Sequence, residues 1–438
     1  MLSSSMYLFA SKVIGYGVRI LVPIALVRIL SKEDFGAYNQ FFLLEVLVQT
    51  IFQMGVVQSL FYFVPRDRDN AGGYLVNSLG LNTVIYTSAY ALVWCFRGQV
   101  ARLLGIGVIF DYFWYIFFYA LLVMLNICLE SYCAARREIR AASFLTIQRE
   151  VVAAVATFGA AIAYRSLDKI FLGLVIGRAL SLAIGLAYVH VRLNGFASRR
   201  YFFSVWEQIR YGLVLGVGGT VGTVAMRLHE IAVNRNYDIE TYAVYAAGLK
   251  QIPVLQFFSQ SIAAVALGQF AMLVKNDDWS GVRQFWDRIL GTMYGVGLPV
   301  ILLFVAVADP LVRLMFTSEY AGAVAIFRLN LLGTLSLVLN STLVLRAMDR
   351  NDVTLKVNIG MFVLLFPALY AGMKLAGLEG IIAAHGLLLL VNRIAAQAYL
   401  NRLVPVHLGY VPSPQSVRAF YVGGWRRAVA WAGRRRSR

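Results

Sequence analysis

The chain has 438 residues, of which 60% are hydrophobic and only 14% are charged. A soluble domain has about 45–50% apolar and about 25% charged residues, so this composition excludes both a water-soluble enzyme and a disordered chain. Lys and Arg number 40 against 22 Asp and Glu, which gives a net charge of +18. The basic residues gather in short links between apolar runs and in the tail. That distribution indicates a multi-pass membrane protein that follows the positive-inside rule, and it argues against a nucleic-acid-binding protein.

About twelve apolar runs, each long enough to span a bilayer as a helix, follow one another along the chain. Strands are not expected, because barrel strands are about ten residues long and alternate strictly. The sequence therefore predicts an all-α integral membrane protein with about twelve transmembrane helices. The runs are 6–27, 38–64, 76–96, 108–133, 142–164, 169–191, 209–233, 242–274, 288–308, 322–345, 354–375 and 378–400.

The widest basic link, around residue 200, separates the first six runs from the last six. We therefore expect an N-terminal six-helix lobe at residues 1–200, a C-terminal six-helix lobe at 201–400 and a basic cytoplasmic tail at 401–438. The links alternate between rich and poor in Lys and Arg, which predicts that both termini face the cytoplasm. A faint repeat at an offset of 207 residues supports the two halves. It pairs Arg28, Glu33, Tyr38, Gln49 and Gln53 with Arg235, Glu240, Tyr245, Gln256 and Gln260.

Polar side chains follow one face of several predicted helices at steps of three or four residues. Each ionisable group at this depth costs at least ~2.5–3.5 kcal/mol, so those present usually face a cavity or a partner. Only Glu45, Glu130 and Glu230 are expected to neutralise the cations there, which predicts a cavity with excess positive charge that suits an anion. The candidate substrate-binding residues are Lys12, Arg19, Arg28, Arg227, Lys250 and Arg328. Candidates for coupling or charge balance are Glu45 and Glu230, and candidates for the polar lining are Gln49, Gln53, Thr220, Thr223, Gln256 and Gln260.

Each of these patterns also has a plainer interpretation. The paired glutamines can simply bond between helices, Arg227 and Glu230 can form a local ion pair at helical spacing, and Lys12 can extend its amine to the membrane surface. Arg178, taken to lie near a helix end, is interpreted as an anchor rather than a site residue. No histidine or cysteine has the spacing of a metal site, and no catalytic constellation is recognised.

Four stretches resemble elements of the polysaccharide (O-antigen and exopolysaccharide) flippases, which belong to the multidrug/oligosaccharidyl-lipid/polysaccharide (MOP) exporter superfamily. RILSKEDFGAY at Arg28–Tyr38 resembles the element that closes the first helix of these proteins. Three later elements are similar in the same order: DIETYAVYAAGLK at Asp238–Lys250, DPLVRLMFTSEY at Asp309–Tyr320 and GLEGIIAAHG at Gly377–Gly386. The chain departs from the family where His229 or Glu230 stands in place of a frequent Asp, so coupling to protons or sodium is left open.

The resemblance implies a V-shaped pair of six-helix lobes that works by alternating access, as a transporter without cofactor or metal rather than as an enzyme. It implies a flippase in the bacterial inner membrane that moves an undecaprenyl-pyrophosphate-linked oligosaccharide, surrounded by membrane lipids and working with a polysaccharide polymerase and a chain-length regulator. The alternatives are a lipid II or teichoic-acid precursor flippase of the same superfamily and, less favoured, a membrane polymerase or glycosyltransferase.

Overall fold

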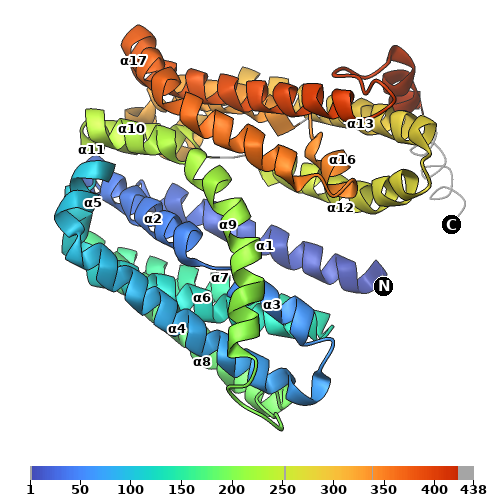
Figure 1. Ribbon diagram of the computed structural model, residues 1–438. Helices are drawn as coiled ribbons and strands as arrows, with labels where there is room; N and C mark the ends of the chain where they lie inside the picture. The colour runs from blue at the N-terminus through green and yellow to red at the C-terminus, as the bar shows by residue number, and fades with distance from the viewer. Residues whose placement is uncertain (1, 251–252, 338, 423–438) are drawn as a thin grey trace, which may run out of the picture. The chain divides into compact units, whose positions relative to one another are not determined.

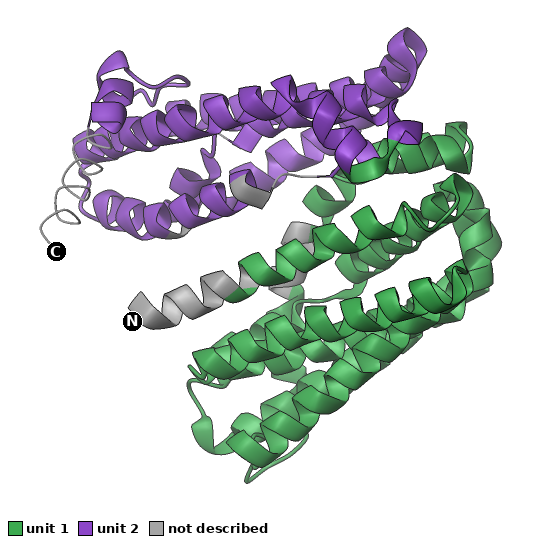
Figure 2. Ribbon diagram, turned by 180° about the vertical axis from the view of Figure 1, so that it is seen from behind, with its two compact units in different colours: residues 1–246, 315–317 green, residues 247–314, 318–438 purple. Residues whose placement is uncertain are grey.

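The computed structural model describes residues 2–250, 253–337 and 339–422, with side chains except at 2–10, 12, 214–219, 253, 254 and 264. Throughout this part of the chain every regular element is a helix and no strand forms, as the sequence predicts (Figure 1). The helices make two compact units, which are coloured separately in Figure 2. Unit 1 extends to Ala246 and includes Met315–Thr317, and unit 2 comprises Ala247–Leu314 and the chain from Ser318 onward.

Unit 1 is built around three mutually packed helices, α6, α7 and α8, with α1 against α7 and α4 against α6. Aromatic and branched side chains such as Tyr132, Leu129 and Leu145 fill the space between them. The elements are α1 (Leu2–Leu26), α2 (Lys32–Phe52), α3 (Val56–Phe63), η1 (Arg68–Asn70), α4 (Ala71–Cys95), α5 (Arg97–Leu104), η2 (Gly107–Tyr112), α6 (Phe113–Ala135), α7 (Ile139–Tyr164), α8 (Leu167–Leu193), α9 (Val205–Ala225), α10 (Leu228–Asn236) and most of α11 (Ile239–Gly248).

Unit 2 packs α12 against α13 and α16, and α17 against α15 and α16. Its core includes the fully buried Trp286, whose indole Nε1 donates to Gly409 O at 2.8 Å, so the chain after α17 returns to α13. The elements are α12 (Pro253–Lys275), α13 (Trp279–Ala306), α14 (Ala308–Phe316, divided between the units), η3 (Ser318–Tyr320), α15 (Ala323–Gly333), η4 (Thr334–Leu337), α16 (Thr342–Ala347) and α17 (Asn351–Leu403). The expected lobes at 1–200 and 201–400 are not the same division of the chain as these two compact units, and they stay a prediction.

Each of the twelve apolar runs falls mainly on helix, so their helical character is confirmed. Among the described residues, seven helices are long and apolar enough to cross a membrane, or up to nine if two bent pairs each count as one span. One of the seven, α17, contains two predicted runs, which are separated by a break in its backbone. The first run corresponds to α1 (Leu2–Leu26), which is not among the seven. The number of spans therefore stays a prediction.

α2 and α3 meet at a bend of 51°, and α9 packs closely against this bend. Gly55 has φ 61°, a left-handed conformation that strains any residue with a Cβ. A Cβ on Gly55 would lie only 2.2 Å from the carbonyl oxygen of Gly212 in α9. Nearby, the buried Gln208 Nε2 donates to Ser59 Oγ at 3.1 Å and to Ser78 Oγ at 3.2 Å. The start of α9 is therefore tied to α3 and α4.

α17 is two helices joined by a sharp break rather than one straight rod. Gly377 has φ 57° and ψ −132°, a region that is open essentially only to glycine. The two arms then pack closely, because a Cβ on Gly380 would lie 1.9 Å from the carbonyl oxygen of Gly372. The break falls at the boundary between the predicted runs 354–375 and 378–400, and it lies in the stretch GLEGIIAAHG.

We expect Gly377→Ala to lower the stability of unit 2 by roughly 1–3 kcal/mol, because the new Cβ strains the break. Gly360→Ala in the first arm of α17 is the matched control, since nothing lies within 4 Å of its added Cβ. The measurement is the fraction of each detergent-purified variant that stays monodisperse after graded heating. Equal melting of the two variants would contradict the requirement for glycine at this break.

Candidate functional site

A network of ion pairs joins α1, α6, α7 and α8 in the interior of unit 1. Glu150 accepts hydrogen bonds from Arg19 at 2.6 Å and from Arg178 at 3.2 Å, and it forms an ion pair with Arg149 at 3.1 Å. Arg149 also pairs with Glu130 at 2.9 Å. The network therefore contains three guanidinium groups and two carboxylates. We call these five residues the Glu150 network.

The helices bring these side chains together through close packing and backbone contacts. Gly15 faces α7, where a Cβ would already lie 3.3 Å from Glu150 Cγ, so α1 can approach the carboxylate. Arg19 lies one turn further along the same face of α1 and reaches Glu150. Arg178 is fixed from α8, because it donates to the carbonyl of Arg149 at 3.0 Å and lies 5.4 Å from the centroid of the Tyr119 ring.

Exposure divides the Glu150 network into a fixed part and an accessible part. The side chains of Glu150, Arg149 and Arg178 are 3%, 7% and 7% exposed, whereas that of Arg19 is 53% exposed. A buried ion pair that loses one partner leaves a charge without compensation, which typically costs 3–5 kcal/mol. Glu150 keeps two buried cations when Arg19 moves away, so Arg19 is the member that can change partner at low cost.

A second cluster lies at the start of α10. Arg227 pairs with Glu230 at 2.6 Å, and Tyr242 donates to the other carboxylate oxygen of Glu230 at 3.1 Å. Buried His229 Nδ1 lies 2.8 Å from Tyr245 Oη. Arg227 and Glu230 thus form a local ion pair at helical spacing. The Arg227 side chain is nevertheless 41% exposed, against 8% for Glu230.

Glu45 connects the two clusters electrostatically. It is buried in α2, with 8% of its surface exposed, and it interacts through space with Arg178, Arg19 and Arg227. Tyr16 on α1 likewise interacts with both Arg19 and Arg227. Arg19 and Arg227 therefore both lie within electrostatic range of Glu45 and Tyr16.

The other candidate residues make contacts of their own or belong to unit 2. Arg28 donates to the carbonyls of Ile24 and Met315, and Arg328 in unit 2 donates to Val305 O at 3.3 Å. Lys250 follows α11 in unit 2 and is half-buried. The side chain of Lys12 lies outside the described residues.

The polar-lining candidates belong to α2 or its C-cap, to α9 and to α12, and they differ in exposure. Thr220 donates to Thr50 O at 3.2 Å and so joins α9 to α2. Half-buried positions are Gln49, Gln53 and Gln256, and exposed positions are Thr223 and Gln260. Within the ranges that the structure describes, no group of three or more His, Cys, Asp or Glu residues could hold a metal ion.

The sequence analysis misses three members of the Glu150 network. Arg149 and Glu150 lie within the predicted run 142–164, where two adjacent charges at mid-membrane were a usable signal. The interpretation of Arg178 as an anchor is wrong, because it lies near the middle of α8, is 6% exposed and pairs with Glu150.

The predicted excess of buried positive charge is also wrong for the two clusters and Glu45. Their formal charges balance, because Glu150 supplies a carboxylate that the sequence analysis does not count. The arginines are Arg19, Arg149, Arg178 and Arg227, and the glutamates are Glu45, Glu130, Glu150 and Glu230. The accessible charges of these ion pairs are positive, because the half-exposed members are Arg19 and Arg227.

A family model described as "Polysaccharide biosynthesis protein" matches residues 25–325, which include α2 to α14 and both arginine clusters except for Arg19. The chain belongs to the polysaccharide biosynthesis protein family. This agrees with the resemblance carried by the stretch Arg28–Tyr38. No curated protein matches the sequence.

Solved structures share the fold of this family member at low sequence identity. An inward-facing multidrug resistance MATE family transporter of the MOP superfamily gives a TM-score of 0.72 at 12% identity, with 88% of this chain and 94% of that chain covered. The lipid II flippase MurJ, in an inward closed conformation, gives 0.71 at 13% identity, with 92% and 88% covered. A MOP superfamily transporter from Pyrococcus furiosus gives 0.63 at 13% identity, with 92% and 95% covered. The chain therefore has the fold of these MOP superfamily proteins.

We expect Glu150→Gln to destabilise unit 1 by about 3–5 kcal/mol, because three guanidinium groups then lose their shared carboxylate. Glu138→Gln, at the N-cap of the same helix, is the matched control, since Glu138 is exposed and makes no side-chain capping bond to α7. Heating of the purified variants, followed by size-exclusion chromatography, measures the difference. A Glu150→Gln protein as stable as the control would show that the network does not hold these helices together.

Proposed function

We propose that this protein is a flippase that moves an undecaprenyl-pyrophosphate-linked oligosaccharide across the bacterial inner membrane by alternating access. Membership of the polysaccharide biosynthesis family and the MOP exporter fold support transport of a lipid-linked substrate. The product would supply a surface polysaccharide such as O-antigen or exopolysaccharide, through a polymerase and a chain-length regulator. Residues 1–200 and 201–400 would be the two lobes, and both termini would be cytoplasmic.

The observation that carries the proposal is the unequal exposure of the paired charges in unit 1. Arg19 and Arg227 are 53% and 41% exposed, whereas their partners Glu150 and Glu230 are 3% and 8% exposed. An anion that reaches this surface therefore meets guanidinium donors before it meets carboxylates. A multidrug substrate of positive charge would meet the same donors and be repelled, so the arrangement favours an anionic substrate.

The chemistry of guanidinium groups suits a pyrophosphate. An arginine presents several N–H donors in a planar fork and can bind two phosphate oxygens at once, which a lysine cannot do. Arg19 and Arg227 both lie within electrostatic range of Glu45, which supports their action on one headgroup. We propose that the pyrophosphate takes Arg19 from Glu150, which keeps Arg149 and Arg178.

Exchange of ion-pair partners also provides a way to couple binding to a conformational change. A ligand shifts an equilibrium only by its difference in affinity for two states. In the structure Arg19 joins α1 to α7 through Glu150. Substrate binding at Arg19 would weaken that link, and release would restore it. Lys12, Arg28, Lys250 and Arg328 are the further substrate contacts of this proposal.

Deletion of the gene should stop surface polysaccharide while the lipid-linked unit still assembles inside the cell. The reason is that the proposed step follows assembly and precedes polymerisation. Staining of surface glycan measures the first effect, and extraction of the lipid-linked unit measures the second. Loss of the unit itself would favour a glycosyltransferase instead, and an unchanged glycan with a block in cell-wall precursors would favour a lipid II flippase.

Arg19→Ala and Arg227→Ala should reach the membrane in normal amounts and export about ten- to a hundredfold less glycan, since each loses a charged hydrogen bond worth roughly 1.5–3 kcal/mol. Lysine at either position should restore export only in part. Arg313→Ala is the matched control, because Arg313 is also a half-exposed arginine, paired with Asp309 at 3.0 Å on the same helix.

The paired variant Arg227→Ala with Glu230→Ala separates a substrate contact from a structural ion pair. If Arg227 serves only to neutralise Glu230, removing both charges should restore export. If Arg227 binds the substrate, the double variant should stay as defective as Arg227→Ala. Recovery of transport in the double variant would therefore overturn the role assigned to Arg227.

A further inference from the structure

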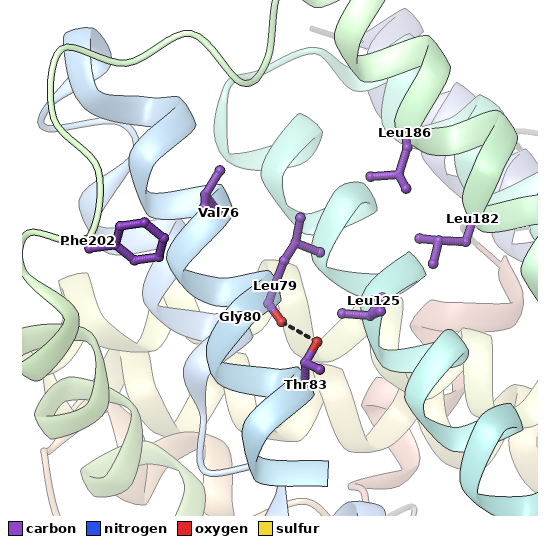
Figure 3. Close-up of a pocket in the computed structure, with 8 residues that line it drawn as sticks. All are labelled: Val76, Leu79, Gly80, Thr83, Leu125, Leu182, Leu186 and Phe202. Atoms are coloured by element: carbon purple, nitrogen blue, oxygen red, sulfur yellow. Dashed lines mark hydrogen bonds between the residues drawn. The ribbon is translucent and has the colours of Figure 1, made fainter. Parts of the chain in front are cut away.

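An apolar pocket of about 330 Å³ opens between α4, α6 and α8. None of its lining residues belongs to either arginine cluster. Figure 3 shows Leu182 and Leu186 of α8 and Leu125 of α6 on one side, opposite Leu79 and Val76 of α4. Phe202, from the link between α8 and α9, closes one end. The remaining lining residues are Gly80 and Thr83.

The surface of the pocket offers no evident polar contact to a ligand. The hydroxyl of Thr83 donates to Leu79 O at 2.9 Å, within α4 itself (Figure 3). Gly80 faces open space, with nothing within 4 Å of the position of a Cβ. From Val76 to Thr83 the pocket follows two turns of α4, about 10 Å at a rise of 1.5 Å per residue. These dimensions suit part of one hydrocarbon chain.

The link that closes the pocket is fixed to α4. The side chain of Asn77 accepts from Phe202 N at 3.1 Å and donates to Phe203 O at 2.8 Å. Phe202 is therefore held beside Val76, although its side chain is 73% exposed. The backbone of the link is therefore fixed beside the pocket, while most of the Phe202 surface remains accessible to a ligand.

The same link carries the positive charge next to the pocket. Arg199 and Arg200 precede Phe202 by three and two residues, and both are exposed. Arg200 N is bound to Asn70 Oδ1 at 3.1 Å, so the basic pair lies at the start of α4. Asp69 pairs with Arg199 at 3.3 Å on the surface, where both side chains are largely in solvent. Such exposed pairs are weak and leave the arginine available to an anion.

We propose that this pocket binds one acyl chain of an anionic phospholipid, whose headgroup phosphate lies against Arg199 and Arg200. Hydrocarbon chains fill apolar pockets of spanning helices, and basic residues beside such pockets select anionic headgroups. The lipid is a resident of the bilayer rather than the transported substrate, because the proposed pyrophosphate contacts lie on α1 and before α10. The site does not depend on the proposed function.

The test uses the full-length protein purified in detergent and reconstituted with phosphatidylglycerol that carries a diazirine in its acyl chain. We expect photo-labelling of peptides that contain residues 76–83 and 182–186. Unlabelled phosphatidylglycerol should compete, and phosphatidylcholine should compete at least about fivefold less well, since each basic residue near a membrane surface contributes roughly fivefold in affinity for an anionic lipid.

Two variants separate the chain pocket from the basic link. Gly80→Phe should fill the pocket and abolish labelling, whereas Gly159→Phe on α7, an exposed helical glycine with equally open space, should not. Arg199→Gln with Arg200→Gln should keep labelling but remove the preference for phosphatidylglycerol, and this pair remains informative if Gly80→Phe fails to fold.

Three outcomes would overturn the proposal. They are labelling that is unchanged in Gly80→Phe, equal competition by phosphatidylcholine in the wild-type protein, and competition by undecaprenyl phosphate that exceeds competition by phosphatidylglycerol. The last outcome would instead assign the pocket to the tail of a polyprenyl lipid.

Discussion

One carboxylate within a membrane-spanning helix holds much of unit 1 together. Glu150 receives guanidinium groups from α1, from its own helix α7 and from α8. In an apolar surrounding each of these charges alone would be costly, and in water the same pairs would be weak. Their mutual compensation explains how α7 can carry Arg149 and Glu150 side by side at its centre. It also makes the positions of three helices depend on each other.

That dependence is what a transporter needs, because its site must be both preformed and able to change. The buried members, Arg149 and Arg178, give the network a stable base. Arg19 is attached to the same carboxylate but is half-exposed, so it can exchange partners without leaving Glu150 uncompensated. The Arg227–Glu230 pair repeats the pattern, with Tyr242 as the second donor to the carboxylate. In both clusters a buried glutamate thus fixes the position of an accessible arginine.

The sequence predicts the helices well because hydrophobic length is a local property that each segment carries by itself. It even predicts the break in α17, since residues 376 and 377 separate two apolar runs. Charge compensation is different, because it depends on which helices meet. Nothing in the local pattern says that Arg19 reaches Glu150 across 131 positions of sequence. The charge pattern of each separate helix therefore does not reveal the role of Glu150.

The contact between Gly55 and Gly212 fixes the first part of α9 against the bend between α2 and α3. Before this contact, Gln208 is bonded to α3 and α4, so this end of the helix is anchored. α9 continues from Gly212 for thirteen residues to Ala225, about 20 Å at a rise of 1.5 Å per residue, and the chain then turns into α10 at Arg227. Along this length Thr220 donates to Thr50 O of α2 at 3.2 Å. Two glycines thus let α9 pass close to the earlier helices, and hydrogen bonds on either side of them hold the helix that leads to Arg227.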